Sequence, residues 1–177
     1  MNEVLKAIEQ RSSTRHFTEE KLTREELELL IKTGLQAPTA TNRQEIHFTV
    51  VGGDNPILAE IEREMLAVGG SHRVFEKNFY FGAPVLLLLS AEKAFSWGPV
   101  DAGIAVENIA IAAESMGLGS LIIGCIKRAM NGERQAEFAE KLGIPDGYAF
   151  EIAIALGHKA SIKEPHTYSM EKNVNFV

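Results

Sequence analysis

The sequence of 177 residues combines 45% hydrophobic with 24% charged residues, which is typical of a globular protein with one sizeable core. A net charge of −6 disfavours nucleic acid as a partner, because nucleic-acid-binding proteins concentrate positive charge on one face. The single cysteine cannot form an internal disulfide, the first residues show no apolar leader, and every apolar run is far shorter than the roughly 20 residues that span a bilayer. We therefore expect a cytoplasmic protein without a membrane segment.

Residues 2–10 place Val4, Leu5 and Ile8 on one helical stripe, which predicts a short amphipathic helix. The helix gives way to Arg11-Ser12-Ser13-Thr14-Arg15-His16-Phe17, the most informative segment of the chain. Guanidinium groups and hydroxyls together bind phosphate oxygens through charge-assisted hydrogen bonds. The segment therefore predicts a site for a small phosphorylated ligand. The alternative is that its arginines only interact with the negative end of the helix.

Thr23 and Glu26 form the signature of a capping box and predict the start of a second helix. That helix must end by Ala37, because Pro38 disfavours helical geometry at the residue before it. We expect residues 38–44 to form a polar loop.

The middle of the chain predicts strands at residues 46–52 and 85–89, with a helix at 56–67 between them. The run at 85–89 is apolar without alternation, as expected for a central strand covered on both faces. Four aromatic residues precede it and could belong either to the core or to the wall of a flat pocket: Phe75, Phe79, Tyr80 and Phe81.

The second half predicts an alanine-rich helix at residues 101–116, a strand at 121–126, a helix at 133–142 and a strand at 149–156. Gly117 is a plausible stop for the alanine-rich helix, whose small residues indicate close packing in a sandwich or dimer. With no repeat and no strict βαβ alternation, the order favours an α+β sheet with helices on both faces.

The last twenty residues, 158–177, are polar and offer few core positions. They could be ordered only by lying across another surface. We therefore predict one domain, residues 1–157, followed by an extension at 158–177.

Several familiar kinds of site have no support in the sequence. The glycines Gly117, Gly119 and Gly124 do not fit the spacing of a dinucleotide-binding loop, and no phosphate-binding loop motif occurs. The histidines show no metal-type pattern, no Ser-His-Asp set stands out, and Cys125 in an apolar stretch is best interpreted as a small buried hydrophobe. We predict no metal and no side chain that acts as acid, base or nucleophile.

Four segments together, in this order, resemble the FMN-dependent nitroreductase family. They are Arg11 to Phe17, Ala37 to Gln44, Asp101 to Ser120, and Gly143 to Tyr148 with Ala155-Leu156-Gly157-His158. The resemblance implies a three-layer α-β-α sandwich around a mixed, mainly antiparallel sheet, and an intertwined homodimer whose C-terminal extension packs on the partner subunit. It also implies FMN as the cofactor.

The residues that match the family's flavin contacts are Arg11, Ser12, Ser13, Arg15, Pro38, Thr39, Asn42, Ile122, Ile123, Gly124 and Lys159. The resemblance assigns the arginines and serines to the phosphate and ribityl chain, the loop residues to the ring of the partner subunit's flavin, and the residues at 122–124 to backbone contacts near the flavin N5. Lys159, with Lys163 behind it, is the expected C-terminal basic group of the phosphate site. Glu45 and Ile46 depart from the family, whose members often have Pro-Trp there.

The resemblance implies an oxidoreductase in which FMN takes a hydride from NADH or NADPH and then reduces a nitroaromatic, a quinone or a similar flat acceptor by a ping-pong mechanism. A dehalogenating or flavin-degrading relative would keep the same FMN residues. Two alternatives stay open: a flavin-binding or redox-sensing protein with little turnover, and a phosphate-binding module without flavin. Arg43, His72 and Arg73 are too few spare basic residues to decide between NADH and NADPH.

Overall fold

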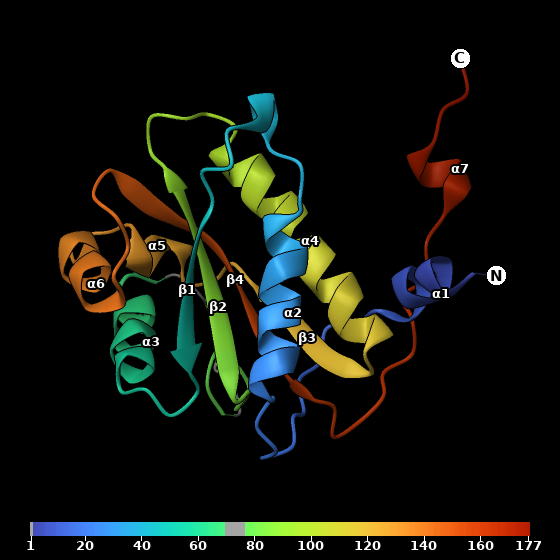
Figure 1. Ribbon diagram of the computed structural model, residues 1–177, viewed down its shortest axis with the longest axis horizontal. Coiled ribbons are helices and arrows are strands. Elements are labelled where there is room, and N and C mark those ends of the chain that lie inside the picture. The colour runs from blue at the N-terminus through green and yellow to red at the C-terminus, as the bar shows by residue number, and fades with distance from the viewer. Residues whose placement is uncertain (1, 70–76) are drawn as a thin grey trace.

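A four-stranded sheet lies between two layers of helices in the computed structural model, which describes residues 2–69 and 77–177 (Figure 1). The strands are β1 (His47–Gly52), β2 (Val85–Glu92), β3 (Leu118–Ile123) and β4 (Tyr148–His158), in the spatial order β1-β2-β4-β3. The helices are α1 (Glu3–Gln10), α2 (Arg24–Leu35), the 3-10 turn η1 (Ala40–Asn42), α3 (Ile57–Ala67), α4 (Gly98–Ser115), α5 (Lys127–Met130), α6 (Gln135–Leu142) and α7 (Met170–Asn173). The predicted α+β three-layer sandwich is confirmed.

All neighbouring strands of the sheet run antiparallel. We expected a mixed, mainly antiparallel sheet, and among the described residues the parallel part is confined to one isolated bridge between Ser13 and Ser120. That bridge lies on β3, an edge strand, so it concerns the segment that follows α1 rather than the body of the sheet.

Strand β2 is buried on both faces, as its unbroken apolar run predicted. Leu86 and Leu88 pack into the core on the side of α3, α5 and α6, whereas Leu87 and Leu89 pack into the core on the side of α2 and α4. Successive side chains of a strand point to opposite faces, so one continuous apolar strand serves two cores.

Helix α2 begins at the predicted capping box. The Thr23 hydroxyl accepts a hydrogen bond from the Glu26 N–H at 3.2 Å, and the Glu26 carboxylate accepts one from the Thr23 N–H at 2.8 Å. The Thr23 N–H, together with the Thr23 hydroxyl that donates to the same carboxylate at 2.9 Å, favours the charged form and lowers the pKa of Glu26.

Helix α4 is the long central helix of its layer and packs through alanines. Ala102, Ala105, Ala110 and Ala113 are all at most 1% exposed, which allows the helix to approach the sheet closely. No helix in the described part of the chain has both the length and the apolar character needed to cross a membrane.

The chain turns directly from α4 into β3 at Gly117, whose φ of 76° suits a residue without a side chain. The strand therefore begins at Leu118, three residues before the predicted start at 121, and ends at Ile123 rather than 126. Residues 124–126 instead turn into α5, a short helix that the sequence analysis missed.

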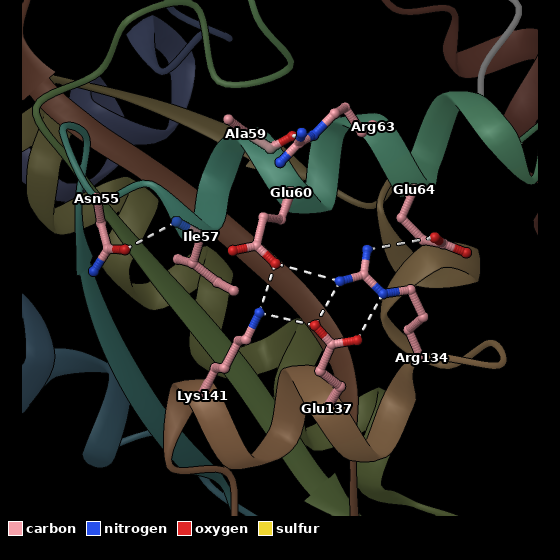
Figure 2. A network of polar contacts seen from close by, with 9 residues as sticks. All are labelled: Asn55, Ile57, Ala59, Glu60, Arg63, Glu64, Arg134, Glu137 and Lys141. Atoms are coloured by element: carbon pink, nitrogen blue, oxygen red, sulfur yellow. Dashed lines mark hydrogen bonds and ion pairs between the residues drawn. The ribbon is translucent and has the colours of Figure 1, made fainter.

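An ionic network joins α3 to α6 on the face of the sheet opposite to α2 and α4 (Figure 2). Arg134 contacts Glu137 at 2.5 Å, and Lys141 contacts Glu60 at 2.7 Å and Glu137 at 2.8 Å. The hydrogen bond from Arg134, reinforced by the one from Lys141, lowers the pKa of Glu137 to about 2. The network holds the two helices against each other.

Candidate functional site

The segment 11–17 lies across the edge of the sheet at β3. The Thr14 N–H donates to the Ser120 carbonyl at 2.8 Å, and Ser13 and Ser120 form the parallel bridge. The Thr14 side chain is buried against Gly119, where an added Cβ would come within 2.8 Å of both its Cγ2 and its Oγ1. A glycine at 119 is therefore what allows this segment to approach the strand so closely.

The same segment also pairs with the chain that leaves β4. Phe17 forms an antiparallel bridge with Lys159, and the Ala160 N–H donates to the His16 carbonyl at 2.9 Å. Two regions far apart in the sequence are thus fastened side by side, and both were predicted to contribute to one anion site.

A surface hollow of about 260 Å³ lies between these two regions. We call it the serine hollow, and its lining residues are Ser12, Ser13, Thr14, Arg15, His16, Ser161, Ile162 and Lys163. Hydroxyl groups with a guanidinium and an ammonium group form a donor set that suits a phosphate.

The two arginines of the segment differ in how their charge is met. Arg11 Nε lies 3.2 Å from Glu107 Oε1 on α4, so a carboxylate already faces it. Arg15 has no carboxylate partner within the part of the chain that the structure describes. Its guanidinium lies over the Phe81 ring, 5.8 Å from the ring centroid, and its one hydrogen bond to a described residue is a long one of 3.5 Å to the Ser13 carbonyl. Arg15 is therefore the cation of this pair that can meet an incoming anion.

Lys159 is engaged with a different partner from the one expected. Its ammonium group lies 2.7 Å from both carboxylate oxygens of Glu114, and both side chains are largely buried. The pair lines a neighbouring hollow of about 570 Å³ that also contains Glu9 and Glu164. Lys163, which lines both hollows, is the C-terminal basic residue that faces the Arg15 segment. The assignment of Lys159 to a phosphate stays a prediction.

The predicted loop after α2 is present and is held in an unusual backbone conformation. Thr41, Asn42 and Gln44 have φ values of 54° to 56°, a left-handed region that residues with side chains rarely adopt. The Thr39 hydroxyl accepts the Gln44 N–H at 2.9 Å, and the Asn42 amide oxygen accepts from the Gln44 side chain at 3.0 Å. Strained backbone of this kind clusters at ligand sites and persists where the surroundings fix it.

Asp101 fixes this loop to the fold. It is 2% exposed in the first turn of α4, and its carboxylate accepts the Ala40 N–H at 3.0 Å. Sequence reasoning included Asp101 in a matching segment but gave it no role. An acidic residue in the first turn of a helix was the available signal, and it did not reveal the distant partner.

The loop after α2 lies at one end of α4, and β3 begins at the other end of this helix (Figure 1). Asp101 contacts the loop and Glu114 contacts Lys159 beside the hollow. Asp101 and Glu114 are 13 positions apart on the helix, which corresponds to about 20 Å at 1.5 Å per residue. A single chain therefore does not bring Pro38, Thr39 and Asn42 to the segment 11–17.

Residues 122–124 lie farther along the same edge strand as the serine hollow. Ile122 is half-buried, Ile123 is buried, and Gly124 is exposed with open space where a Cβ would be. From Ser120 to Gly124 the strand advances about 13 Å. An elongated ligand with a phosphate in the serine hollow could thus extend along β3 toward these backbone groups.

Glu45 and Ile46, the two residues that depart from the family pattern, lie directly before β1. Glu45 is 8% exposed, and neither of its carboxylate oxygens has a hydrogen-bond partner among the described residues. Ile46 lines a small hollow of about 190 Å³ with Thr39 and Gln44.

The described aromatic residues that precede β2 do not share one environment, so the choice between core and pocket wall differs from residue to residue. Phe79 is 1% exposed in the core, and the Tyr80 hydroxyl donates to the Gly53 carbonyl at 3.0 Å. Phe81 instead lies under Arg15. Phe75 is outside the described residues.

Of the basic residues considered for NADPH, Arg43 is already engaged. It pairs with Glu92, and its guanidinium lies 4.7 Å from the Phe95 ring centroid. His72 and Arg73 are outside the described residues.

Cys125 is half-buried, and burial raises the pKa of its thiol, which suits a packing role. In the ranges 2–69 and 77–177, no group of three or more histidine, cysteine or acidic side chains is arranged to hold a metal ion.

Comparisons with known proteins agree with the fold and identify the family of the chain. The family model described as "Nitroreductase family" matches residues 8–158. A Bacillus subtilis protein named FMN reductase (NADPH) is 30% identical, over 92% of this chain and 68% of its own length. Among solved structures, a nitroreductase with bound FMN from Desulfitobacterium hafniense aligns with a TM-score of 0.87 at 31% identity, covering 100% of this chain and 99% of its own. A nitroreductase with bound FMN from Bacteroides fragilis aligns with the same TM-score at 26% identity, covering 100% of both chains.

The family match covers the Arg11 to Phe17 segment, the loop after α2 and the strand β3, which are the parts that build the candidate site. On this match and on the shared fold, the chain belongs to the nitroreductase family.

Proposed function

We propose that this chain binds FMN along the edge strand β3 and acts as an NAD(P)H-dependent oxidoreductase that reduces nitroaromatic, quinone or similar flat, electron-poor acceptors. The observation that carries the proposal is the serine hollow, in which Arg15 meets no described carboxylate and lies among hydroxyl groups. The FMN-containing relatives and the relative named FMN reductase support the choice of cofactor.

The donor set fits the phosphate of FMN. Arg15 and Lys163 supply positive charge, and the Ser12 and Ser13 hydroxyls can occupy the remaining lone pairs of the phosphate oxygens. The strand from Ser120 to Gly124 then provides a backbone edge for the rest of an elongated ligand.

Bound FMN would supply the two-electron chemistry, which is the acceptance of a hydride from NADH or NADPH and the transfer of electrons to the acceptor. The protein's own groups bind and orient. Arg15, Lys163 and the serines hold the phosphate end, and the backbone at Ile123 and Gly124 lies where a donor to the ring can tune hydride transfer. No side chain of the site is assigned a proton-transfer role.

The proposed active protein is a homodimer. Pro38, Thr39 and Asn42 lie about 20 Å along α4 from the serine hollow, so within one chain they cannot complete the same small site. A second copy can bring its own loop to the flavin ring.

We also propose that residues 1–157 form the FMN-binding domain and that 158–177 pack on the partner subunit. In the single chain, Ile162, Tyr168 and Phe176 are 91%, 80% and 90% exposed. Apolar side chains exposed to this degree in one extended segment favour a covering surface.

We place the protein in the cytoplasm, where a lone thiol stays reduced.

The first experiment is a visible absorption spectrum of the purified protein, repeated after adding NADH or NADPH without oxygen. The proposal predicts flavin bands that bleach with at least one nicotinamide and return when a quinone or nitroaromatic is added. A colourless protein that takes up no FMN would contradict the cofactor and favour a phosphate-binding module.

A flavin-binding or redox-sensing protein with little turnover is the second candidate. The replacement of Pro-Trp by Glu45-Ile46 favours it, as does the Glu45 carboxylate, which has no hydrogen-bond partner among the described residues, because both alter the loop proposed to lie beside the ring. Bands that bleach fully but support only slow steady-state oxidation of nicotinamide with every acceptor would identify this candidate.

A further inference from the structure

We propose that Phe81 is a positioning residue that holds the Arg15 guanidinium toward the flavin phosphate. The inference rests on the proposed function, because it concerns the same phosphate site, and it assigns a role to an aromatic residue outside the set matched to flavin contacts.

The first observation is the state of Arg15. Its guanidinium lies 5.8 Å from the Phe81 ring centroid, within the range of a cation–π contact. Two nearby cations are held by carboxylates, Arg11 by Glu107 and Lys159 by Glu114. A ring orients a guanidinium without neutralising it, so Arg15 keeps its full charge for an anion.

The second observation is the backbone at Phe81, which has a φ of 55°. A bulky residue in the left-handed region costs free energy that a glycine would not, and such strain persists only where the surroundings fix it. The following residue, Gly82, has a φ of 72°, so the chain uses glycine for the same conformation one position later. Unlike a glycine, the phenylalanine at position 81 places an aromatic ring beneath the Arg15 guanidinium.

The surrounding segment is well fixed by hydrogen bonds. The Phe81 N–H donates to the Asn78 carbonyl at 3.0 Å, and the Gly82 N–H donates to the Asn78 side chain at 2.9 Å. The Tyr80 hydroxyl is held by the Gly53 carbonyl at 3.0 Å. The ring is therefore presented from a rigid turn.

The serine hollow and the ring meet the same arginine. Arg15 lines the hollow, whereas Phe81 does not. Arg15 thus lies over a ring that a hydrogen-bonded turn presents, and it also lines a hollow in which its N–H groups can meet a phosphate.

The test compares the affinity of apo-protein for FMN and for riboflavin, which lacks the phosphate, by quenching of flavin fluorescence. Phe81→Leu removes the ring, Phe81→Tyr keeps it, and Phe79→Leu is the matched control in the core. We expect Phe81→Leu to weaken FMN by about three- to tenfold and to leave riboflavin unchanged. Phe81→Tyr should bind both flavins as the parent does, and Phe79→Leu should leave the ratio of the two affinities unchanged.

A double-mutant cycle with Arg15→Gln separates positioning from packing, since the loss caused by Phe81→Leu should disappear when Arg15 is absent. The inference is overturned if Phe81→Leu binds FMN as tightly as the parent, if it weakens FMN and riboflavin equally, or if its effect is the same in the Arg15→Gln background. Should Phe81→Leu fail to fold, Phe81→Met enters the same comparison with the same outcomes. A parent protein that binds no FMN would instead contradict the proposed function.

Discussion

Gly119→Ala is the substitution that most directly tests how the candidate site is held to the fold. The new methyl group would come within 2.8 Å of both Thr14 Cγ2 and Thr14 Oγ1 and within 3.0 Å of Lys159 Cγ. Threonine carries two heavy atoms in three staggered positions, and two of those positions face the methyl group. Every rotamer therefore leaves at least one heavy atom in conflict.

Relief requires the segment 11–17 to move away from β3, which weakens the hydrogen bond between the Thr14 N–H and the Ser120 carbonyl. Overpacking of this kind costs about 1–3 kcal/mol. For a chain of this length the loss corresponds to a fall in Tm of about 3–10 °C. Because the segment carries Arg15 and the serines, FMN retention should fall as well.

The assay is thermal unfolding by circular dichroism together with the ratio of flavin to protein absorbance after purification. Gly103→Ala is the matched control, because a Cβ at Gly103 meets nothing within 4 Å and the residue lies inside α4, where alanine is the better helix former. The control should melt at or above the parent's Tm with the same flavin content. A Gly119→Ala protein that matches the parent in both measurements would refute the reasoning.

Three further predictions concern single contacts. Arg15→Gln should lower FMN affinity more than Arg11→Gln, since Glu107 already faces Arg11; fluorescence titration measures this, and equal losses would contradict the assignment. The pKa of Glu137 is lowered to about 2 in the folded state, whereas its unfolded pKa is about 4.3. The charged Glu137 therefore stabilises the fold at pH values above about 4.3, and this contribution is lost as the pH falls toward 2. Urea midpoints should therefore drop over that interval, and less so in Arg134→Gln; identical pH curves would show that the network is not responsible. Thr23→Ala should lower stability by about 1 kcal/mol through loss of the α2 cap, measured by urea unfolding, with flavin content unchanged.

Local patterns in the sequence determined much of the fold. The capping box at Thr23, the apolar run of β2 and the alanine-rich α4 were all predictable, because each rests on interactions between near neighbours or on a simple periodicity. The donors of the segment 11–17 are adjacent in the chain, so the sequence alone could suggest a phosphate site there, and that assignment stays a prediction.

Only the tertiary structure decided how the charges of the candidate site are distributed. Lys159 was expected at the phosphate, yet it pairs with Glu114, which is 45 positions away, and nothing in the local sequence marks that partner. The support of Arg15 by Phe81 and the anchoring of the loop by Asp101 are likewise contacts between distant segments.

The limits of β3 show the same division. The apolar residues predicted a strand, but the tight turn at Gly117 and the pairing of β3 with β4 set the start of the strand at Leu118. The sequence by itself determined most of the longer helices and strands and suggested which residues could hold a phosphate, because these depend on local propensity and on side-chain chemistry. The tertiary structure decided which cations are neutralised and which stay available, because that depends on which distant groups the packed sheet and helices bring together.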